Sequence, residues 1–177
     1  MALTAREFWT VIHGMLLGSL FLLAFGGGLA GFWSLRPEWV TQAGIEERLR
    51  RLTGGTWLMA IVAWLTVITG TYIVYPWYRA KLPEGTTDLV HYPRYFLLSR
   101  PETAEWHKFG MEWKEHVAWM APILATAVAY VVVRYGRRLA EDRRMRTALI
   151  VLFVVAFGAA AAAGLFGAFI NKVAATR

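Results

Sequence analysis

The stretch TALIVLFVVAFGAAAAAGLFGAFIN, residues 147–171, contains no Asp, Glu, Lys or Arg and is long enough for a bilayer-crossing helix, which needs about 20 apolar residues. The segments that share this lack of charge are 8–35, 53–78 and 117–133. Charged residues make up 18% of the chain, against roughly 25% of an ordinary soluble domain. The sequence therefore predicts an all-α integral membrane protein with four crossings.

We expect a four-helix bundle that forms a single domain over residues 1–177, with helices at about 5–33, 53–78, 100–134 and 147–171. Thr4 and Glu7 have the spacing of a capping box, and so do Ser99 and Glu102, so each pair would start a helix. Small residues spaced four apart let helices approach closely, and the last helix has such a stripe at Ala160, Gly164 and Ala168.

The two short connections, 36–51 and 134–146, are rich in arginine, which places them in the cytoplasm by the positive-inside rule. Both termini and the long loop at 79–115 would then lie outside a bacterial inner membrane. We expect this loop to contain a helix at the membrane interface. The net charge of +7 indicates contact with anionic lipid rather than with nucleic acid.

The chain contains no cysteine, which excludes disulfides, iron–sulfur clusters and haem attached through a C-x-x-C-H motif. Any cofactor must be held by His, Met, carboxylate or backbone groups. The chain also lacks a P-loop, a nucleophile elbow and a zinc-protease helix. The sequence therefore favours a subunit of a larger complex over an enzyme that acts alone.

Two histidines, His13 and His116, fall near the outer ends of the first and third predicted helices, at depths that differ by only about 3 Å. These helices would run in the same direction, so the two imidazoles are candidate axial ligands for one haem iron. Gly14 and Gly18 would leave room for a porphyrin beside the first helix. An apolar wall would come from Trp113, Trp119, Met120 and Ile123.

Two further histidines, His91 and His107, are candidate ligands for a cofactor near the outer surface. His107 and His116 are nine residues apart, a rotation of about 900° that puts them on opposite faces of a continuous helix. They should therefore not share an iron, and His107 should face the outer surface or a partner. The basic residues that would pair with haem propionates or contact a partner are Arg94, Arg100 and Lys108.

In its four crossings, with His13 and His116 inside them, the chain resembles the four-helix membrane b-type cytochromes. The resemblance implies haem b and one-electron transfer between a quinol, or another membrane donor, and an external redox protein such as a cytochrome. It also implies other subunits of a membrane redox complex as partners.

Three alternatives stay open. His107 with Met111, and His116 with Met120, have a spacing of four residues and the soft ligands that suit Cu(I). The segment TVITGTYIVYPWYR, residues 66–79, offers the hydroxyls and apolar rings of a quinone pocket. A haem-free structural subunit of a respiratory or photosynthetic membrane complex would also have this composition.

Overall fold

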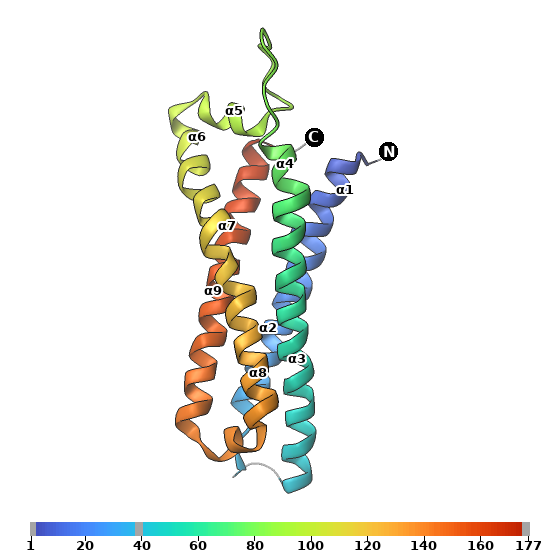
Figure 1. The fold of residues 1–177 in the computed structure, drawn as a ribbon, viewed down its shortest axis with the longest axis vertical. Helices are drawn as coiled ribbons and strands as arrows, with labels where there is room; N and C mark the ends of the chain where they lie inside the picture. The colour runs from blue at the N-terminus through green and yellow to red at the C-terminus, as the bar shows by residue number, and fades with distance from the viewer. Residues whose placement is uncertain (1–2, 38–40, 175–177) are drawn as a thin grey trace. The chain divides into compact units, whose positions relative to one another are not determined.

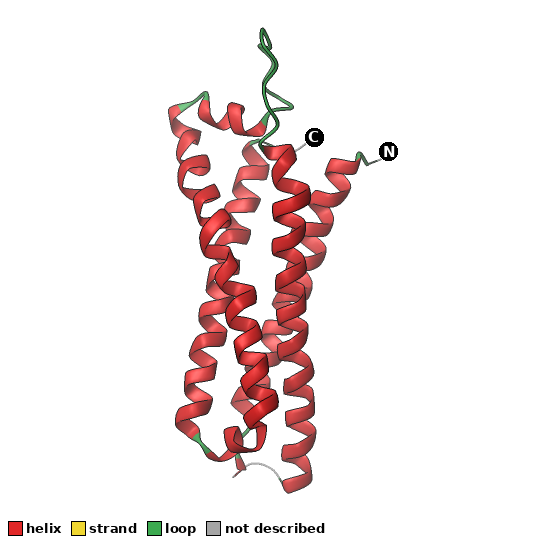
Figure 2. Cartoon of the chain, in the orientation of Figure 1, coloured by secondary structure: helices red, strands yellow, loops and turns green. Residues whose placement is uncertain are grey.

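The computed structural model describes residues 3–37 and 41–174, and all the regular structure in these ranges is helical (Figure 2). Four helices are long and apolar enough to cross a membrane (Figure 1): Ala5–Ser34, Gln42–Tyr78, Pro101–Glu141 and Arg143–Val173. The predicted all-α class with four candidate crossings is therefore confirmed.

Each of the first three spans is made of several helical segments in succession. The first span contains α1 (Ala5–Val11), the π-helical η1 (Ile12–Leu16) and α2 (Leu17–Ser34). The second contains α3 (Gln42–Thr69), the π-helical η3 (Gly70–Val74) and α4 (Tyr75–Tyr78). The third contains α6 (Pro101–Glu105), the π-helical η4 (Trp106–Met111), α7 (Glu112–His116), the 3₁₀ turn η5 (Val117–Trp119) and α8 (Met120–Glu141).

The fourth span is the single helix α9 (Arg143–Val173), and the short helix α5 (Pro93–Leu98) lies in the long loop between α4 and α6. Figure 1 shows α5 between the ends of α4 and α6. Placement of α5 at a membrane interface stays a prediction.

The predicted capping box at Thr4 is confirmed, and the one at Ser99 is wrong. The Thr4 N–H donates to Glu7 Oε2 at 2.9 Å, and the Glu7 N–H donates to Thr4 Oγ1 at 3.2 Å. The Ser99 hydroxyl instead donates to the Phe96 carbonyl at 2.8 Å, because Ser99 caps the C-terminal end of α5. Helix α6 therefore starts after Arg100 without a side-chain cap.

The second span begins at Gln42, well before the predicted start at residue 53. The charged turn that precedes the apolar stretch is stabilised along its surface, since Glu47 accepts from Arg50 and Arg51 at 2.7 Å each. Such pairs three and four residues apart support a helix. These charges therefore extend the helix where the sequence pattern predicts a connection.

The 134–146 connection is likewise almost entirely helical, since only Asp142 separates α8 from α9. Arg146 donates to the carbonyls of Leu139 and Ala140 at 2.7 and 2.9 Å, which satisfies groups left open at the end of α8. An arginine that the positive-inside rule connects with membrane orientation thus also closes the turn.

The chain divides into two compact units. Unit 1 comprises residues 1–18, 65–119 and 161–177, and unit 2 comprises residues 19–64 and 120–160. Both termini and the long loop belong to unit 1, whereas the two arginine-rich connections belong to unit 2. The single domain over residues 1–177 stays a prediction.

Unit 2 has a core of aromatic and aliphatic side chains from α2, α3, α8 and α9. Phe25 stacks on Phe157 with ring centroids 3.9 Å apart, and Phe153 is fully buried beside them. The Trp64 indole N–H donates to the Thr126 hydroxyl at 3.0 Å, which links α3 to α8.

Unit 1 has its own core, in which the side chains come from α4, α5, η4 and the end of α9. Its buried members are Tyr78, Leu97, Met111, Ile170 and Ala174. Tyr75, Phe96 and Trp106 pack around them and are partly buried. Polar and titratable side chains gather beside this apolar cluster, as described below.

The predicted packing stripe of α9 is not the face that packs within the described chain. Gly164 and Ala168 are exposed, whereas Ala156, Ala159 and Ala163 are buried. Most residues between 158 and 168 are Gly or Ala, so a four-residue spacing of small residues occurs on several faces of the helix and does not identify the one that packs.

Candidate functional site

The π-helical segments of the described residues, η1, η3 and η4, all fall in unit 1. A π-helical turn bonds each N–H to the carbonyl five residues back, and such turns are rare and concentrated at functional sites. Here η1 contains His13, η4 contains His107, and η3 begins at Gly70, which His13 contacts. The candidate site therefore lies in unit 1.

The His13 ring is oriented by a neighbouring span. Its Nδ1 lies 3.2 Å from Thr69 Oγ1, and that hydroxyl donates its own proton to the Leu65 carbonyl at 2.7 Å. A hydroxyl carries one proton, so Thr69 Oγ1 must accept from Nδ1–H of His13. The Nε2 atom of His13 then carries the lone pair, which is the form of histidine that binds metals.

The His13 ring also rests on the helix backbone at Gly70. A Cβ atom at Gly70 would lie 2.7 Å from His13 Cε1 and 3.3 Å from Nε2. The carbon Cε1 makes the closest approach, and Nε2 is the next nearest ring atom. A glycine is therefore required where the ring meets η3.

Lys114 of α7 places an ammonium group inside unit 1. Its Nζ is 3.4 Å from the Ala163 carbonyl. A Cβ atom at Gly167 would lie 2.8 Å from Nζ. The small residues of α9 thus make room for a lysine within the third span.

His116 forms its contacts within its own helix. Its Nδ1 donates to the Glu112 carbonyl at 3.0 Å and lies 3.4 Å from the Glu112 carboxylate, so in the neutral ring Nε2 carries the lone pair. The side chain is 70% exposed. The contacts described for His13 and His116 involve different residues, and they do not join the two rings.

His107 faces the interior of unit 1, where the rotation argument predicts the outer surface or a partner. Its Nδ1 lies 2.8 Å from the Tyr78 hydroxyl, and the ring is half-buried. The regular rotation of 100° per residue does not hold between residues 107 and 116, because η4 closes its turns over one residue more than an α-helix. The assignment of faces from an ideal helix is therefore wrong for His107.

Three buried polar atoms next to this pair have no hydrogen-bond partner among the described residues: Tyr75 Oη, Arg94 Nε and Glu115 Oε1. The Tyr75 hydroxyl lies beside the Glu115 carboxyl, and the two residues come from α4 and α7. Buried polar groups without a partner are uncommon and point to a water, an ion or a ligand.

Of these three residues, sequence reasoning assigns a role only to Arg94, which would pair with haem propionates or contact a partner. Tyr75 enters this reasoning only as part of the segment 66–79. Tyr75 and Glu115 are 40 positions apart in the sequence, and no spacing rule connects them. Only the tertiary structure, which brings the Glu115 carboxyl near Tyr75, shows that they belong to one site.

The remaining predicted residues lie around this cluster. His91 is exposed in the turn before α5, and Arg100 lies over the Phe96 ring at 5.2 Å. Lys108 pairs with Glu105 at 3.2 Å. A Cβ atom at Gly14 would meet no atom within 4 Å, and the same is true of Gly18, so the surface beside His13 is open.

The sulfur ligands of the copper alternative have different surroundings. Met111 is buried in the apolar core of unit 1, whereas Met120 is 44% exposed. The described residues contain no cluster of three or more His, Cys, Asp or Glu side chains arranged to hold a metal ion. The groups positioned to bind a ligand are therefore the histidine imidazoles and the polar atoms of Tyr75, Arg94 and Glu115.

Comparison of the chain with models of protein families, with curated proteins and with solved structures gives no match. The resemblance to membrane b-type cytochromes therefore depends on the four apolar helices and on the histidines within them.

Proposed function

We propose that the chain is an electron-transfer subunit of a membrane redox complex and binds haem b through His13 and His116. One observation carries the proposal: in both residues Nδ1 is hydrogen-bonded within the protein, which leaves Nε2 of the neutral ring to bind a metal. Metal-ligating histidines are held in this way, with the second ring nitrogen donating to a carbonyl or another acceptor. Haem bound between two imidazoles supplies one-electron transfer.

The surroundings of the two histidines support a flat, apolar ligand. Gly14 and Gly18 leave an open surface beside His13, and the exposed ring of His116 leaves its Nε2 accessible. Arg94 has a buried Nε without a partner among the described residues, which suits a propionate. His107 is the secondary candidate, and Tyr78 already engages one of its ring nitrogens.

The electron donor in this proposal is a quinol. Tyr75, Glu115 and the Tyr78–His107 pair offer hydrogen-bonding groups beside an apolar cluster, which is the composition of a quinone site. Glu115 would accept one of the protons that the quinol releases when it gives up its electrons. The acceptor would be an external redox protein on the side that carries the termini and the long loop, outside a bacterial inner membrane.

A haem-free accessory subunit is the second candidate. The observation that favours it is the position of His116, which is largely exposed and bonded to its own helix. In this function the exposed apolar faces would contact lipid and neighbouring chains.

Visible absorbance spectra of the purified protein, oxidised and dithionite-reduced, test the proposal after expression with sufficient haem. We expect a reduced α-band in the unaltered protein and its loss in both His13→Ala and His116→Ala. His91→Ala is the matched control, because His91 is exposed in the loop, and it should keep the band.

Absence of a band in the unaltered protein would favour the accessory subunit. A band that survives both substitutions would show that His13 and His116 are not the haem ligands. His107→Ala would then identify whether the third imidazole of unit 1 holds the haem.

A further inference from the structure

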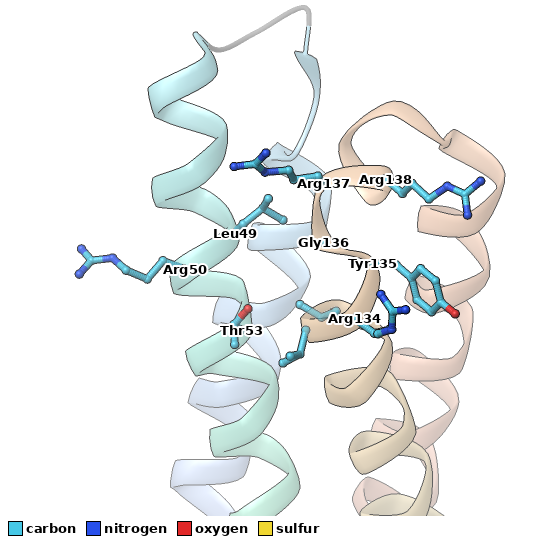
Figure 3. A pocket seen from close by; sticks show the side chains of 10 residues that line it. Leu49, Arg50, Thr53, Arg134, Tyr135, Gly136, Arg137 and Arg138 are labelled. Carbon is cyan, nitrogen blue, oxygen red and sulfur yellow. The ribbon is translucent and has the colours of Figure 1, made fainter.

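Unit 2 contains a pocket of about 590 Å³ between α3 and α8 (Figure 3). The α3 residues that line it are Leu49, Arg50 and Thr53. The α8 residues that line it are Val132, Val133, Arg134, Tyr135, Gly136, Arg137 and Arg138. The lining therefore combines aliphatic side chains with four arginines and contains no acidic residue.

A break in α8 shapes this pocket. Tyr135 has φ −128° and ψ 18°, outside the helical region, so the helix is kinked there. The kink brings Gly136 to Leu49, since a Cβ atom at Gly136 would lie 3.4 Å from Leu49 Cδ2. Arg137 then reaches Glu46 of α3 at 3.2 Å. Backbone geometry and a bridge between the helices thus hold the pocket open.

The arginines of the pocket are exposed at its rim. Figure 3 shows Arg137 extending toward α3, whereas Arg50 and Arg138 extend away from the pocket. The Arg134 guanidinium lies over the Tyr135 ring, 5.3 Å from its centroid. The neighbouring carboxylates, Glu46 and Glu47, neutralise only part of this charge, because they bind Arg137 and Arg50. The pocket rim is therefore positive.

Along α8, the apolar part of the pocket lining comes first and the basic part comes after it. Val132 and Val133 belong to the uncharged part of the third span, and the arginines follow directly at its end. A ligand that fits both parts has an anionic group attached to a hydrocarbon chain. Basic pockets between membrane helices bind such lipid headgroups.

We propose that this pocket binds the phosphate group of an anionic phospholipid, with an acyl chain along Val132 and Val133. The guanidinium groups present paired N–H donors that match phosphate oxygens. Arg134 and Arg138 line the pocket without a carboxylate partner among the described residues, so their guanidinium groups are the ones that would turn into the pocket to meet the phosphate. The proposal stands on unit 2 alone and does not depend on haem binding in unit 1.

Lipid titration monitored by native mass spectrometry of the detergent-purified full chain tests this site. The probes are phosphatidylglycerol, phosphatidylcholine and inorganic phosphate. An arginine near an anionic headgroup contributes roughly a fivefold gain in affinity. We therefore expect the double variant Arg134→Gln/Arg138→Gln to bind phosphatidylglycerol roughly 30-fold more weakly. Phosphatidylcholine should bind more weakly than phosphatidylglycerol to the unaltered protein.

The matched control is Arg143→Gln/Arg144→Gln, which removes the same charge from exposed residues of α9 that do not line the pocket. It should bind phosphatidylglycerol like the unaltered protein. A second variant, Arg134→Lys/Arg138→Lys, keeps the charge and the membrane orientation, and it should lose part of the affinity because lysine lacks the planar fork.

Three outcomes would overturn the assignment. Equal weakening in the pocket and control variants would mean that diffuse surface charge attracts the lipid. Equal affinity for phosphatidylcholine would remove the role of an anionic headgroup. Inorganic phosphate that displaces the lipid at equal concentration would assign the pocket to a free anion. Circular dichroism of each variant establishes that its helices are intact.

Discussion

The His13 ring packs directly against the helix backbone at Gly70, with no space for a side chain between them. Its ring lies on Gly70 while its Nδ1 is held by Thr69, so two adjacent residues of the second span determine where it points. A substitution at Gly70 should therefore disturb His13 although Gly70 carries no functional group.

Gly70→Ala should destabilise the protein by about 1–3 kcal/mol, because the new Cβ would overlap His13 Cε1 and force the ring to move. Gly54→Ala is the control in the same span, where a Cβ meets no atom within 4 Å. It should increase stability by up to about 1 kcal/mol, since alanine favours helix over glycine. Unfolding free energies in mixed micelles measure both, and equal stabilities would contradict the contact.

The Tyr78–His107 hydrogen bond supports a second prediction. Tyr78→Phe should lower the free energy of unfolding by about 1 kcal/mol, because it leaves a half-buried ring nitrogen without its partner. Tyr130→Phe removes a hydroxyl from a side chain that is 61% exposed and should have little effect. The same denaturation measurement compares them, and a similar small loss for both would show that the bond contributes nothing.

The helices of unit 2 pack closely where α2 meets α9. In the run Gly26, Gly27, Gly28, a Cβ at either of the first two positions meets no atom within 4 Å. At Gly28 it would lie 2.6 Å from Cζ of the fully buried Phe153. One glycine of the three thus allows the close approach of an aromatic ring.

Gly28→Ala should therefore destabilise the protein by about 1–3 kcal/mol, whereas Gly27→Ala should leave it as stable or slightly more so. Thermal or denaturant unfolding of the two single variants checks the difference. A larger loss of stability in Gly27→Ala than in Gly28→Ala would contradict the close approach of Gly28 to the Phe153 ring.

The number and apolar character of the helices could be predicted from the sequence, because a bilayer-length stretch without charge has few other structures. Their ends could not. The ion pairs of Glu47 extend the helix of the second span, and Arg146 closes the turn after α8. Charged residues therefore mark the end of an apolar segment in the sequence, but they also stabilise helical turns beyond it. Composition does not distinguish these two uses.

The candidate site could be predicted less completely. Depth along the helices identifies His13 and His116, whereas their ring orientations come only from Thr69 and the Glu112 carbonyl. The inward position of His107 depends on η4, and π-helical turns leave no clear mark in a single sequence. The position of Tyr75 beside Glu115 is set by tertiary structure, which the spacing of residues in the sequence does not report.

The distribution of charge over the whole chain makes a prediction about membrane orientation. The arginine-rich ends of the spans belong to unit 2, and the long loop belongs to unit 1. Positive charge is retained on the cytoplasmic side during insertion, which would leave the loop outside.

This orientation can be measured with single cysteines, because the chain has none of its own. Thr87→Cys lies in the exposed part of the loop and should react with a membrane-impermeant maleimide on intact cells. Glu141→Cys, also exposed, should react only after the cells are permeabilised. The reverse pattern would invert the topology and move the histidines to the cytoplasmic side.

The π-helical turns make the length of this chain adjustable at defined places. A turn that closes over five residues holds one more than an α-helical turn, so η1 contains a residue that an uninterrupted helix would not need. Deleting the exposed Gly14 would let the segment wind as α-helix and leave the faces of residues 5–11 nearly where they are, because the π-helical turn already absorbs the extra residue. A deletion at such a joint would therefore keep the faces of the span in register while the backbone hydrogen bonds re-form. Divergent copies of this chain can thus differ by one residue there and still fold.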